Sequence, residues 1–312
     1  MGVARAAPTT MLMVVDAHSH VIVPGLGAHV EWRDGAQIVR HGGREIRSAV
    51  REFSDVGRIV EEQGRAGVDA VVLCPWVNLC GVDVERQNEA LASYVGDRVF
   101  ALGTVDLARP EQLRELMHDG RLAGVEIPAA PSGVFLGDER FDEFWAAADE
   151  TGALVFVHPS TRGFALPVMD EHYMWNTLGN PFETTVTAAH MVGAGVLERR
   201  QDVRVLLAHG GGVLPALRGR LAHEQRIHPP GRDVLAAIGR FYVDTVVHDA
   251  GVLRGLVDFF GAERVVLGSD YPFDMGAERP AEVVRALGLD AEDETKILGG
   301  NALGLLRQES PA

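Results

Sequence analysis

Four histidines and one aspartate occupy positions whose spacing favours a metal site. His18 and His20 are one residue apart at the end of a short apolar run, and alternate side chains of a β-strand share a face. His158, His209 and Asp270 each follow a later apolar run. Two imidazoles that converge from one strand suit a divalent metal such as zinc.

These residues fall at the ends of segments that a barrel would bring together. Short apolar segments alternate with segments of helical periodicity, which predicts a parallel sheet with crossover helices. The predicted strands cover residues 12–16, 70–73, 99–105, 123–127, 154–157, 203–208, 241–244 and 264–268. The predicted helices cover 55–66, 85–95, 110–119, 138–151, 184–200, 213–226, 249–260, 279–287 and 291–299. Eight strands predict an α/β fold, the (β/α)8 TIM barrel, in which all carboxyl ends of the strands share one face.

On that face, three imidazoles and one carboxylate form a ligand set with space for a water, namely His18, His20, His158 and Asp270. A divalent metal there would lower the pKa of that water toward neutrality. His209 has no ligand role in this set, and an unligated histidine beside such a water is suited to transfer protons. The glycines at 210–212 permit close approach of the backbone at a loop-to-helix junction.

Each of these residues also has an ordinary structural interpretation. A histidine after a strand can cap a turn or bond a backbone carbonyl, and Asp270 can cap a helix because Pro272 follows closely. The glycines at 210–212 could suggest a phosphate loop, but neither the Gly-x-Gly-x-x-Gly nor the Walker spacing occurs there. The metal site is favoured because all five polar residues fall at predicted strand ends.

The composition limits the class of partner. The 312 residues are 46% hydrophobic and 23% charged, as expected of a soluble globular protein. Lys and Arg number 29 against 44 Asp and Glu, and the net charge of −15 repels phosphate backbones and anionic lipid heads. We therefore expect no nucleic-acid partner, and an anionic small substrate would need a local group of arginines.

The cysteines and the N-terminal region indicate a cytoplasmic location. Cys74 and Cys80 are expected to be free thiols, which fits a reducing compartment. The apolar run at 11–15 is too short for a secretory signal, and no apolar stretch approaches membrane-spanning length, so no membrane partner is expected. We expect residues 1–10 to form a flexible tail and residues 11–312 to form a single domain.

Two connections are too long to be simple turns: residues 21–51 after the first strand and 160–182 after the fifth. Long segments on a compact scaffold commonly form lids or binding loops. Their irregular composition, which includes Gly and Pro, argues against independent domains. We therefore expect both loop insertions to cover the mouth of the barrel.

Four motifs, in this order, resemble the amidohydrolase superfamily. They are Asp-Ala-His-Ser-His at 16–20, Phe-Val-His-Pro at 156–159, Ala-His-Gly-Gly-Gly at 208–212 and Gly-Ser-Asp-Tyr-Pro-Phe at 268–273. More narrowly, the chain resembles the branch of 2-amino-3-carboxymuconate 6-semialdehyde decarboxylase and related non-oxidative decarboxylases. Pro-Phe-Glu-Thr-Thr at 181–185 and the stretch 241–249 strengthen the narrower match, and the resemblance extends from Val14 to about Arg307.

The resemblance implies a set of site residues. The implied Zn2+ ligands are His18, His20, His158 and Asp270, with His209 and Asp270 as the catalytic residues, and another divalent transition metal could take the same place. An arginine after the first strand binds the substrate carboxylate in the family, and Arg51 is the nearest match, with Arg47 as the competitor. In the family, arginines after the His-Gly-Gly-Gly motif reach across the interface of a homodimer. Arg220 matches the first of these positions. Arg226 lies near the second, where this chain offers His228 instead.

Departures from the family pattern lie at the expected substrate pocket. The decarboxylase has a tryptophan after His-Pro, whereas this chain has Ser160 and then Arg162, and residues 25–44 have little in common with the family. Trp175, in the loop before Pro181, either stacks on a planar substrate or packs that loop down. The metal chemistry therefore transfers more directly than the substrate does.

The leading hypothesis is a zinc-dependent non-oxidative decarboxylase, or carboxy-lyase, of a small unsaturated or aromatic carboxylic acid. In it, His209 reprotonates the carbon that loses carbon dioxide, and Arg51 holds the substrate carboxylate. An alternative uses the same site for a metal-dependent hydrolase of a lactone, amide or related carbonyl. A third hypothesis, a barrel whose metal is structural or lost and that serves as a binding protein, is disfavoured by the intact motifs at the strand ends.

Overall fold

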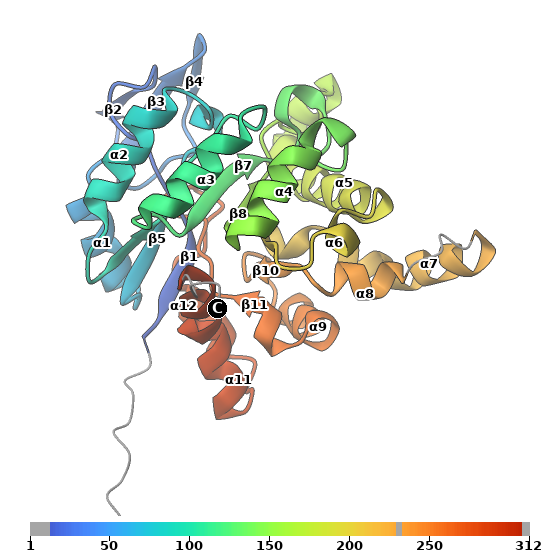
Figure 1. The fold of residues 1–312 in the computed structure, drawn as a ribbon. Helices are drawn as coiled ribbons and strands as arrows, with labels where there is room; N and C mark the ends of the chain where they lie inside the picture. The colour runs from blue at the N-terminus through green and yellow to red at the C-terminus, as the bar shows by residue number, and fades with distance from the viewer. Residues whose placement is uncertain (1–12, 229–232, 308–312) are drawn as a thin grey trace, which may run out of the picture.

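Eight short parallel strands occupy the centre of the structure, a computed structural model that describes residues 13–228 and 233–307. They are β1 (Val15–Val21), β5 (Ala70–Pro75), β6 (Val99–Ala101), β7 (Gly124–Pro128), β8 (Leu154–His158), β9 (Arg204–Leu207), β10 (Tyr242–Asp244) and β11 (Val265–Val266). β1, β5 and β8 are buried along their full length, as expected of parallel strands that are covered on both faces. Helices surround these strands (Figure 1).

The strands close into a barrel. Hydrogen bonds order them as β1-β5-β6 and β11-β10-β9-β8-β7, and the pairings in both sheets are parallel. Parallel bridges join the two sheets at Gly103 with Val125 and at Ser19 with Tyr271. The (β/α)8 TIM barrel predicted from the sequence is therefore confirmed.

Asp16 holds one of these seams, between β1 and the segment after β11. Its buried carboxylate accepts hydrogen bonds from Ser269 N at 2.9 Å, Ser269 Oγ at 2.5 Å and Gln63 Nε2 at 2.6 Å. Burial raises the pKa of Asp16 to about 6 in spite of these bonds. The backbone N–H of Asp270 also donates to the carbonyl of His18 at 2.8 Å, so the seam places both histidines of β1 next to Asp270.

Helices form the outer layer. Those between consecutive barrel strands are α1 (Val56–Arg65), α2 (Val84–Tyr94), α3 (Pro110–Asp119), α4 (Asp142–Thr151), α5 (Asn180–Gly193), α6 (Val196–Arg199), α7 (Leu214–Ile227), α8 (Val234–Ile238) and α9 (Ala250–Phe260). Three more follow the last strand, namely α10 (Pro280–Arg285), α11 (Ala291–Thr295) and α12 (Asn301–Leu306). Pro110 and Pro280 stand in first turns, and Gly152 ends α4 with a left-handed φ of 59°. They stand where the predicted helices at 110–119 and 279–287 begin and where the one at 138–151 ends.

Some boundaries differ from the prediction. The first strand is predicted at 12–16 but runs from Val15 to Val21, because its pairing with β5 continues through the histidine motif. The helix predicted at 184–200 begins at Asn180 and breaks at Gly195, whose φ is 72°, into α5 and α6. α8 and α12 are absent from the prediction, since short helices carry too few residues to show a period.

Residues 21–51, predicted as an irregular covering segment, contain an antiparallel sheet. Its strands β2 (His29–Arg33), β3 (Ala36–His41) and β4 (Arg44–Ile46) pair in chain order. The two turns are Asp34-Gly35 and Gly42-Gly43, whose positive φ values suit two-residue hairpins. The prediction missed this sheet because its polar strands lack the apolar runs that reveal the barrel strands.

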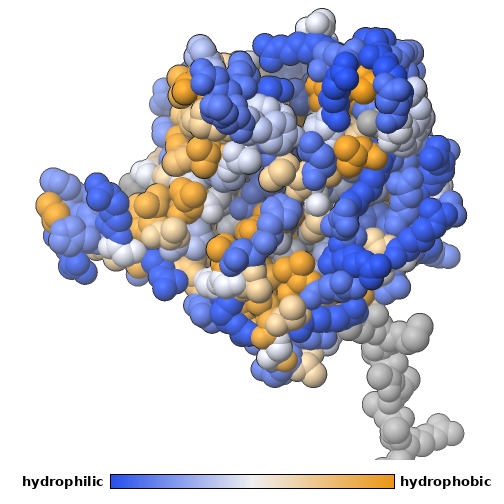
Figure 2. All heavy atoms as spheres, turned by 180° about the vertical axis from the view of Figure 1, so that it is seen from behind, coloured by the Kyte–Doolittle hydropathy of each residue, from blue (hydrophilic) through white to orange (hydrophobic). Residues whose placement is uncertain are grey.

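Helix α7 projects from the body of the protein (Figure 1). Figure 2, which views the opposite side, shows it as an arm extending to the left. Leu214, at its first turn, is the residue of α7 that is buried, whereas Leu217 and Ile227 are exposed. The helix therefore leaves most of its surface without a partner within the described part of this chain.

None of the helices in residues 13–228 and 233–307 is both long and apolar enough to span a bilayer. The predicted tail, residues 1–10, lies outside the described residues. The division of the chain into this tail and a single domain at 11–312, like the cytoplasmic location, stays a prediction.

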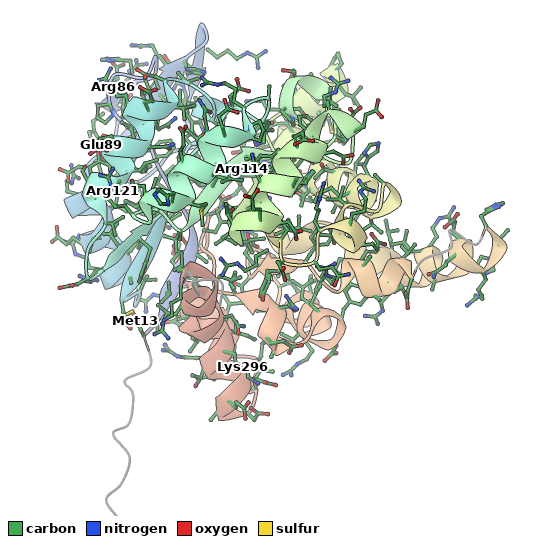
Figure 3. All side chains as sticks on the ribbon, viewed as in Figure 1. Met13, Arg86, Glu89, Arg114, Arg121 and Lys296 are labelled. Atoms are coloured by element: carbon green, nitrogen blue, oxygen red, sulfur yellow. The ribbon has the colours of Figure 1, made fainter. Side chains whose placement is uncertain are left out.

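Two glycines near the C-terminus offer a test of how tightly β1 is held. A Cβ on Gly299, in the helical turn Lys296–Gly300, would overlap the carbonyl oxygen of Met13, which lies near α12 (Figure 3). We expect Gly299→Ala to lower the free energy of unfolding by about 1–3 kcal/mol, because backbone cannot move aside as a side chain can. Urea denaturation followed by circular dichroism measures this change.

The matched control is Gly304→Ala in α12, where an added Cβ meets nothing within 4 Å. Alanine has the higher helix propensity, so this variant should gain up to about 1 kcal/mol. Equal stabilities for the two variants would contradict the close packing of the C-terminal helices against β1.

Candidate metal centre

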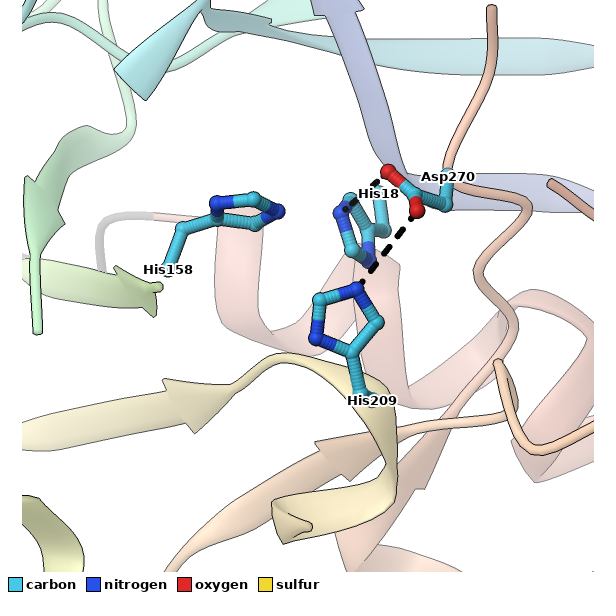
Figure 4. Close-up of side chains that lie close together, drawn as sticks. All are labelled: His18, His158, His209 and Asp270. Atoms are coloured by element: carbon cyan, nitrogen blue, oxygen red, sulfur yellow. Dashed lines mark ion pairs between the residues drawn. The ribbon is translucent and has the colours of Figure 1, made fainter. Parts of the chain in front are cut away.

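The four predicted ligands and His209 lie together at the carboxyl-terminal end of the barrel. His18 and His20 belong to β1, His158 is the last residue of β8, His209 follows β9, and Asp270 follows β11. His18 and His20 are fully buried, and His158 and Asp270 are 6% and 5% exposed. Figure 4 shows three of the rings and the Asp270 carboxylate facing one another. Strand-end placement thus brings together residues that are far apart in sequence.

The donor atoms converge on a small volume. The Nε2 atoms of His18 and His20 are 3.0 Å apart, and Asp270 Oδ1 lies 3.3 Å from each of them. His209 Nε2 lies 3.5 Å from Asp270 Oδ2. Donor atoms of one four-residue group, His18, His158, His209 and Asp270, all lie within 4.8 Å of one another. The site therefore offers five donors, of which a tetrahedral cation needs at most four.

The chemistry of these donors fits a divalent metal. His158 Nε2 and Asp270 Oδ1 are buried and have no hydrogen-bond partner among the described residues. A buried polar atom without a partner costs about 1–3 kcal/mol. A cation bound by imidazole nitrogens and one carboxylate oxygen would satisfy these atoms together with the facing nitrogens of His18 and His20.

Asp244, at the end of β10, orients His18. Its buried carboxylate lies 2.6 Å from His18 Nδ1 and accepts hydrogen bonds from the backbone N–H groups of His209, Gly210 and Val246 at 2.9, 2.9 and 3.0 Å. Burial favours a raised pKa for Asp244, but the bond from the His18 ring outweighs it and lowers the pKa below its ordinary value. The ionised carboxylate holds a proton on His18 Nδ1, which leaves Nε2 as the nitrogen that would bind a metal.

A second buried carboxylate, Glu126 of β7, faces His20. Glu126 Oε2 lies 3.6 Å from His20 Nδ1, and burial raises the pKa of this carboxyl although the nearby imidazole opposes the rise. Sequence reasoning assigned no role to Glu126 or to Asp244. The available signal was an acidic residue in an otherwise apolar strand, within Gly-Val-Glu-Ile-Pro in one case and at the end of Tyr-Val-Asp in the other.

The carboxylates around the rings favour positive charge at the centre. Burial opposes the charged form of His18, but Asp270 and Asp244 outweigh it and raise the pKa of His18 to about 10. At His158, burial and the neighbouring rings of His20 and His18 hold the pKa well below its ordinary value. The surroundings therefore keep His158 neutral, which is the state required of a metal ligand.

The glycines after His209 make its turn possible. His209 has a φ of 55°, and residues 210–212 all have positive φ values. A Cβ on Gly212 would overlap the carbonyl oxygen of Pro181 at the start of α5. The predicted close approach of the backbone is thus confirmed, and it places the turn that carries His209 against α5.

A pocket opens beside the centre and includes parts of both long connections. It is lined by Ile46, Ser48, Trp76, Val77, Asn78, His158, Pro159, Ser160, Arg162, Trp175, Asn176, Asn180, Asp270 and Phe273. Ile46 and Ser48 come from the first connection, and Arg162 and Trp175 come from the second. Both segments therefore contribute to the pocket beside the centre, and their covering of the barrel mouth stays a prediction.

Of the residues predicted to bind substrate, Trp175 lines this pocket and Arg51 does not. The guanidinium carbon of Arg51 lies 5.8 Å from the ring centre of Tyr271, and the side chain lines a separate hollow. Arg47, the competitor, is exposed and pairs with Glu45 at 2.7 Å. The substrate role of Arg51 stays a prediction that the geometry of the pocket does not support.

The two arginines predicted to act across an interface lie on α7, outside the pocket. Arg220 is exposed on the projecting helix. Arg226 is also exposed, and its Nη2 lies 3.0 Å from His223 Nδ1 on the same helix. Neither reaches the centre within one chain, so their proposed role requires a partner subunit.

The fold and the donor set can now be compared with known proteins. A family model for amidohydrolases matches residues 15–308, which include the whole barrel and all five donors. The chain belongs to the amidohydrolase family. The family expected from the four sequence motifs is therefore confirmed.

Named relatives place this amidohydrolase in the branch related to decarboxylases. The 2-amino-3-carboxymuconate-6-semialdehyde decarboxylase of Dictyostelium discoideum is 30% identical over 274 residues, which cover 79% of this chain and 75% of that protein. A decarboxylase of Aspergillus niger, yanB, is 30% identical over 289 residues, which cover 83% of this chain and 77% of that protein.

Solved structures share the fold of this amidohydrolase. The 5-carboxyvanillate decarboxylase LigW of Sphingomonas paucimobilis has a TM-score of 0.80 at 21% identity, with 95% of this chain and 99% of that chain covered. A dihydroxybenzoic acid decarboxylase of a Polaromonas species, solved with bound manganese and the inhibitor 2-nitroresorcinol, has a TM-score of 0.76 at 19% identity. The latter comparison covers 95% of this chain and 97% of that chain.

Removal of a donor should remove the metal from this amidohydrolase. We expect His158→Ala to weaken binding of a divalent metal at least about 100-fold. Removal of a residue that only hydrogen-bonds to a ligand lowers metal affinity about 10- to 100-fold, and loss of the ligand itself should cost more. Competition with a chromophoric chelator measures the affinity. His118→Ala, at an exposed position at the end of α3, is the control, and equal affinities for the two variants would contradict the assigned centre.

The bond between Asp244 and His18 offers a second test. Asp244→Asn removes the charge that holds the proton on His18 Nδ1, and we expect metal affinity to fall about 10- to 100-fold. Asp249→Asn is the matched control, because Asp249 caps α9 at an exposed position and asparagine caps equally well. The same chelator competition applies, and an unchanged affinity in Asp244→Asn would show that this carboxylate does not orient a ligand.

Proposed function

We propose that this amidohydrolase is a divalent-metal-dependent, non-oxidative decarboxylase of a small unsaturated or aromatic carboxylic acid. The observation that carries the proposal is the cluster of buried histidines and Asp270, which opens into a pocket with aromatic walls. The relatives named as decarboxylases support the reaction type and favour it over the hydrolase alternative, which would use the same donors.

The proposed ligands are His18, His20, His158 and Asp270, as expected from the sequence. A bound divalent cation acts as a Lewis acid that stabilises negative charge on the substrate oxygens next to the reacting carbon. Three imidazoles with a single carboxylate suit zinc better than they suit manganese, which prefers oxygen donors. We therefore propose Zn2+, although the Polaromonas structure contains manganese.

His209 is the proposed acid/base. When the bond to the carboxyl group breaks, carbon dioxide leaves and the electron pair stays on the substrate carbon, which must then take a proton. His209 Nε2 lies 3.5 Å from Asp270 Oδ2, and Nδ1 has no hydrogen-bond partner in the described residues. A ring held in this way can deliver a proton to a carbon bound beside Asp270.

The pocket walls orient the acid and exclude water. Trp76, Val77 and Phe273 present apolar surface to the pocket, which suits a flat, conjugated molecule. Exclusion of water strengthens electrostatic interactions in the pocket and favours loss of a neutral product from a charged acid. The proposed substrate class follows from this combination of apolar walls and cationic centre.

We also propose a homodimer, as the family resemblance implies. The support is the projecting helix α7, which exposes Leu217 and Ile227 together with Arg220 and Arg226. These arginines can contact a substrate only if the helix reaches a partner subunit.

The proposed roles separate His209 from His20. The metal-loaded chain should release carbon dioxide from a conjugated carboxylic acid, as measured by loss of ultraviolet absorbance and by trapped carbon dioxide. We expect His209→Ala to retain the metal but to lose about 10²- to 10⁴-fold in kcat, the usual contribution of a general acid. His20→Ala should lose the metal itself.

His118→Ala is the control for both variants. Loss of metal from His209→Ala, with retention in His20→Ala, would show that His209 is the metal ligand and that His20 is not. Product formation without release of carbon dioxide would show that the reaction is hydrolysis and not decarboxylation.

A further inference from the structure

Arg162 is the positive side chain that the pocket offers to a ligand. Among the pocket-lining residues in the described parts of the chain, it alone carries a permanent positive charge. Its side chain is 37% exposed, and its Nη2 lies 3.5 Å from the carboxylate of Asp170, which is itself 73% exposed. An exposed ion pair of this kind is weak, so an anionic ligand can displace Asp170.

Trp175 fixes the direction of this arginine. The guanidinium carbon of Arg162 lies 3.9 Å from the centre of the Trp175 ring. Tyr173 packs against the same ring with 5.0 Å between ring centres, and its hydroxyl donates to Asp274 Oδ1 at 2.9 Å. A guanidinium over an aromatic face keeps its edge N–H groups available for a carboxylate. Trp175 is therefore a positioning residue for Arg162, because the arginine covers ring surface that a substrate would need for stacking.

The segment before Arg162 is fixed by a buried carboxylate. Glu183, in the first turn of α5, is fully buried and accepts hydrogen bonds from Ser160 N at 2.8 Å and Thr161 N at 2.9 Å. The Thr161 hydroxyl donates to the same carboxylate. This segment is where the chain departs from the family pattern, and its hydrogen bonds hold it in one position.

The segment after Arg162 is fixed by close packing. A Cβ on Gly163 would lie 3.1 Å from the Cα of Gly179, and a Cβ on Gly179 would lie 2.7 Å from the Cα of Gly163. Gly179 ends the helical turn that begins with Trp175. Arg162 itself has a φ of 57°, an uncommon conformation for a residue with a side chain. Such strain persists only where the surroundings impose it, and it often marks a functional position.

We propose that Arg162 binds a second anionic group of the substrate, so that the preferred substrate is a planar, conjugated acid with two anionic groups. The inference rests on the proposed decarboxylase function. A divalent cation carries two positive charges, and Asp270, its one proposed carboxylate ligand, neutralises one of them. The remaining charge can bind one carboxylate of the substrate. Arg162 supplies a further positive charge in the same pocket, and its planar N–H groups can bind a second carboxylate through two hydrogen bonds.

The test is a comparison of two ligands that does not require turnover. Isothermal titration of the zinc-loaded chain with benzene-1,3-dicarboxylate and with benzoate gives the ratio of the two affinities. We expect the dicarboxylate to bind about 10- to 100-fold more tightly, as is typical of a charge-assisted bond. Arg162→Gln should reduce this ratio to near one while benzoate binding is retained.

Arg114→Gln is the matched control and should keep the ratio. Arg114, on α3 (Figure 3), is also 37% exposed and has an exposed acidic partner, Glu150, at 2.8 Å. Arg162→Lys should recover only part of the preference, because lysine lacks the planar fork. Trp175→Leu should lower the affinity for the dicarboxylate more than the affinity for benzoate and so reduce the ratio, whereas general damage to the pocket would weaken both ligands equally.

Retention of the preference in Arg162→Gln, or the absence of a preference in the unaltered chain, would overturn the proposal. These outcomes are independent of the proposed reaction. A chain that releases no carbon dioxide from any acid, yet loses its dicarboxylate preference in Arg162→Gln, would refute the decarboxylase and leave the anion site in place.

Discussion

The seam between β1 and the segment after β11 is the contact on which the centre depends. His18 and His20 lie near the beginning of the chain and Asp270 near its end, and only closure of the barrel makes them neighbours. Asp16 bridges a separation of 253 residues through its bonds to Ser269. Its carboxylate is buried at a cost in solvation, which shows in the raised pKa. This unfavourable burial occurs where the first and last strands of the barrel meet.

The polar centre lies at the end of an apolar interior. Val15, Phe156 and Leu206 belong to a buried apolar cluster of the same strands that carry or precede the histidines. Asp244 lies next to the ring of His18 and Glu126 next to that of His20. Each of these rings therefore has its outer nitrogen directed to an acid and its inner nitrogen directed to the centre. This pairing explains how several ionisable groups share a buried site.

The barrel and the donor cluster were predictable because both depend on local patterns. Buried parallel strands have a composition of their own, and a polar residue directly after such a strand stands out. The position of Arg51 was not predictable in this way, because it depends on how its neighbours are buried. Glu52 accepts hydrogen bonds from Phe53 N and Gln37 Nε2, and both Glu52 and Phe53 are buried. With those residues directed inward, Arg51 lies against Tyr271 and away from the pocket.

Asp244 and Glu126 escaped prediction for a different reason. Each lies within a short strand whose apolar neighbours define the element, and the pattern alone does not reveal which ring an interior acid will face. The same holds for Glu183, whose partners Ser160 and Thr161 belong to another segment. Such pairings depend on distances across the barrel, and these become visible only when the strands are assembled.

The beginning of α5 has a consequence for how related enzymes could diverge. It anchors Ser160 and Thr161 through Glu183, and it accommodates the turn after His209 through the contact of Gly212 with Pro181. The arginine proposed to select the acid and the histidine proposed to protonate the product are thus both held by this helix. A substitution near Ser160 could therefore change the acid that a related enzyme accepts, while the residues of its metal centre stay the same.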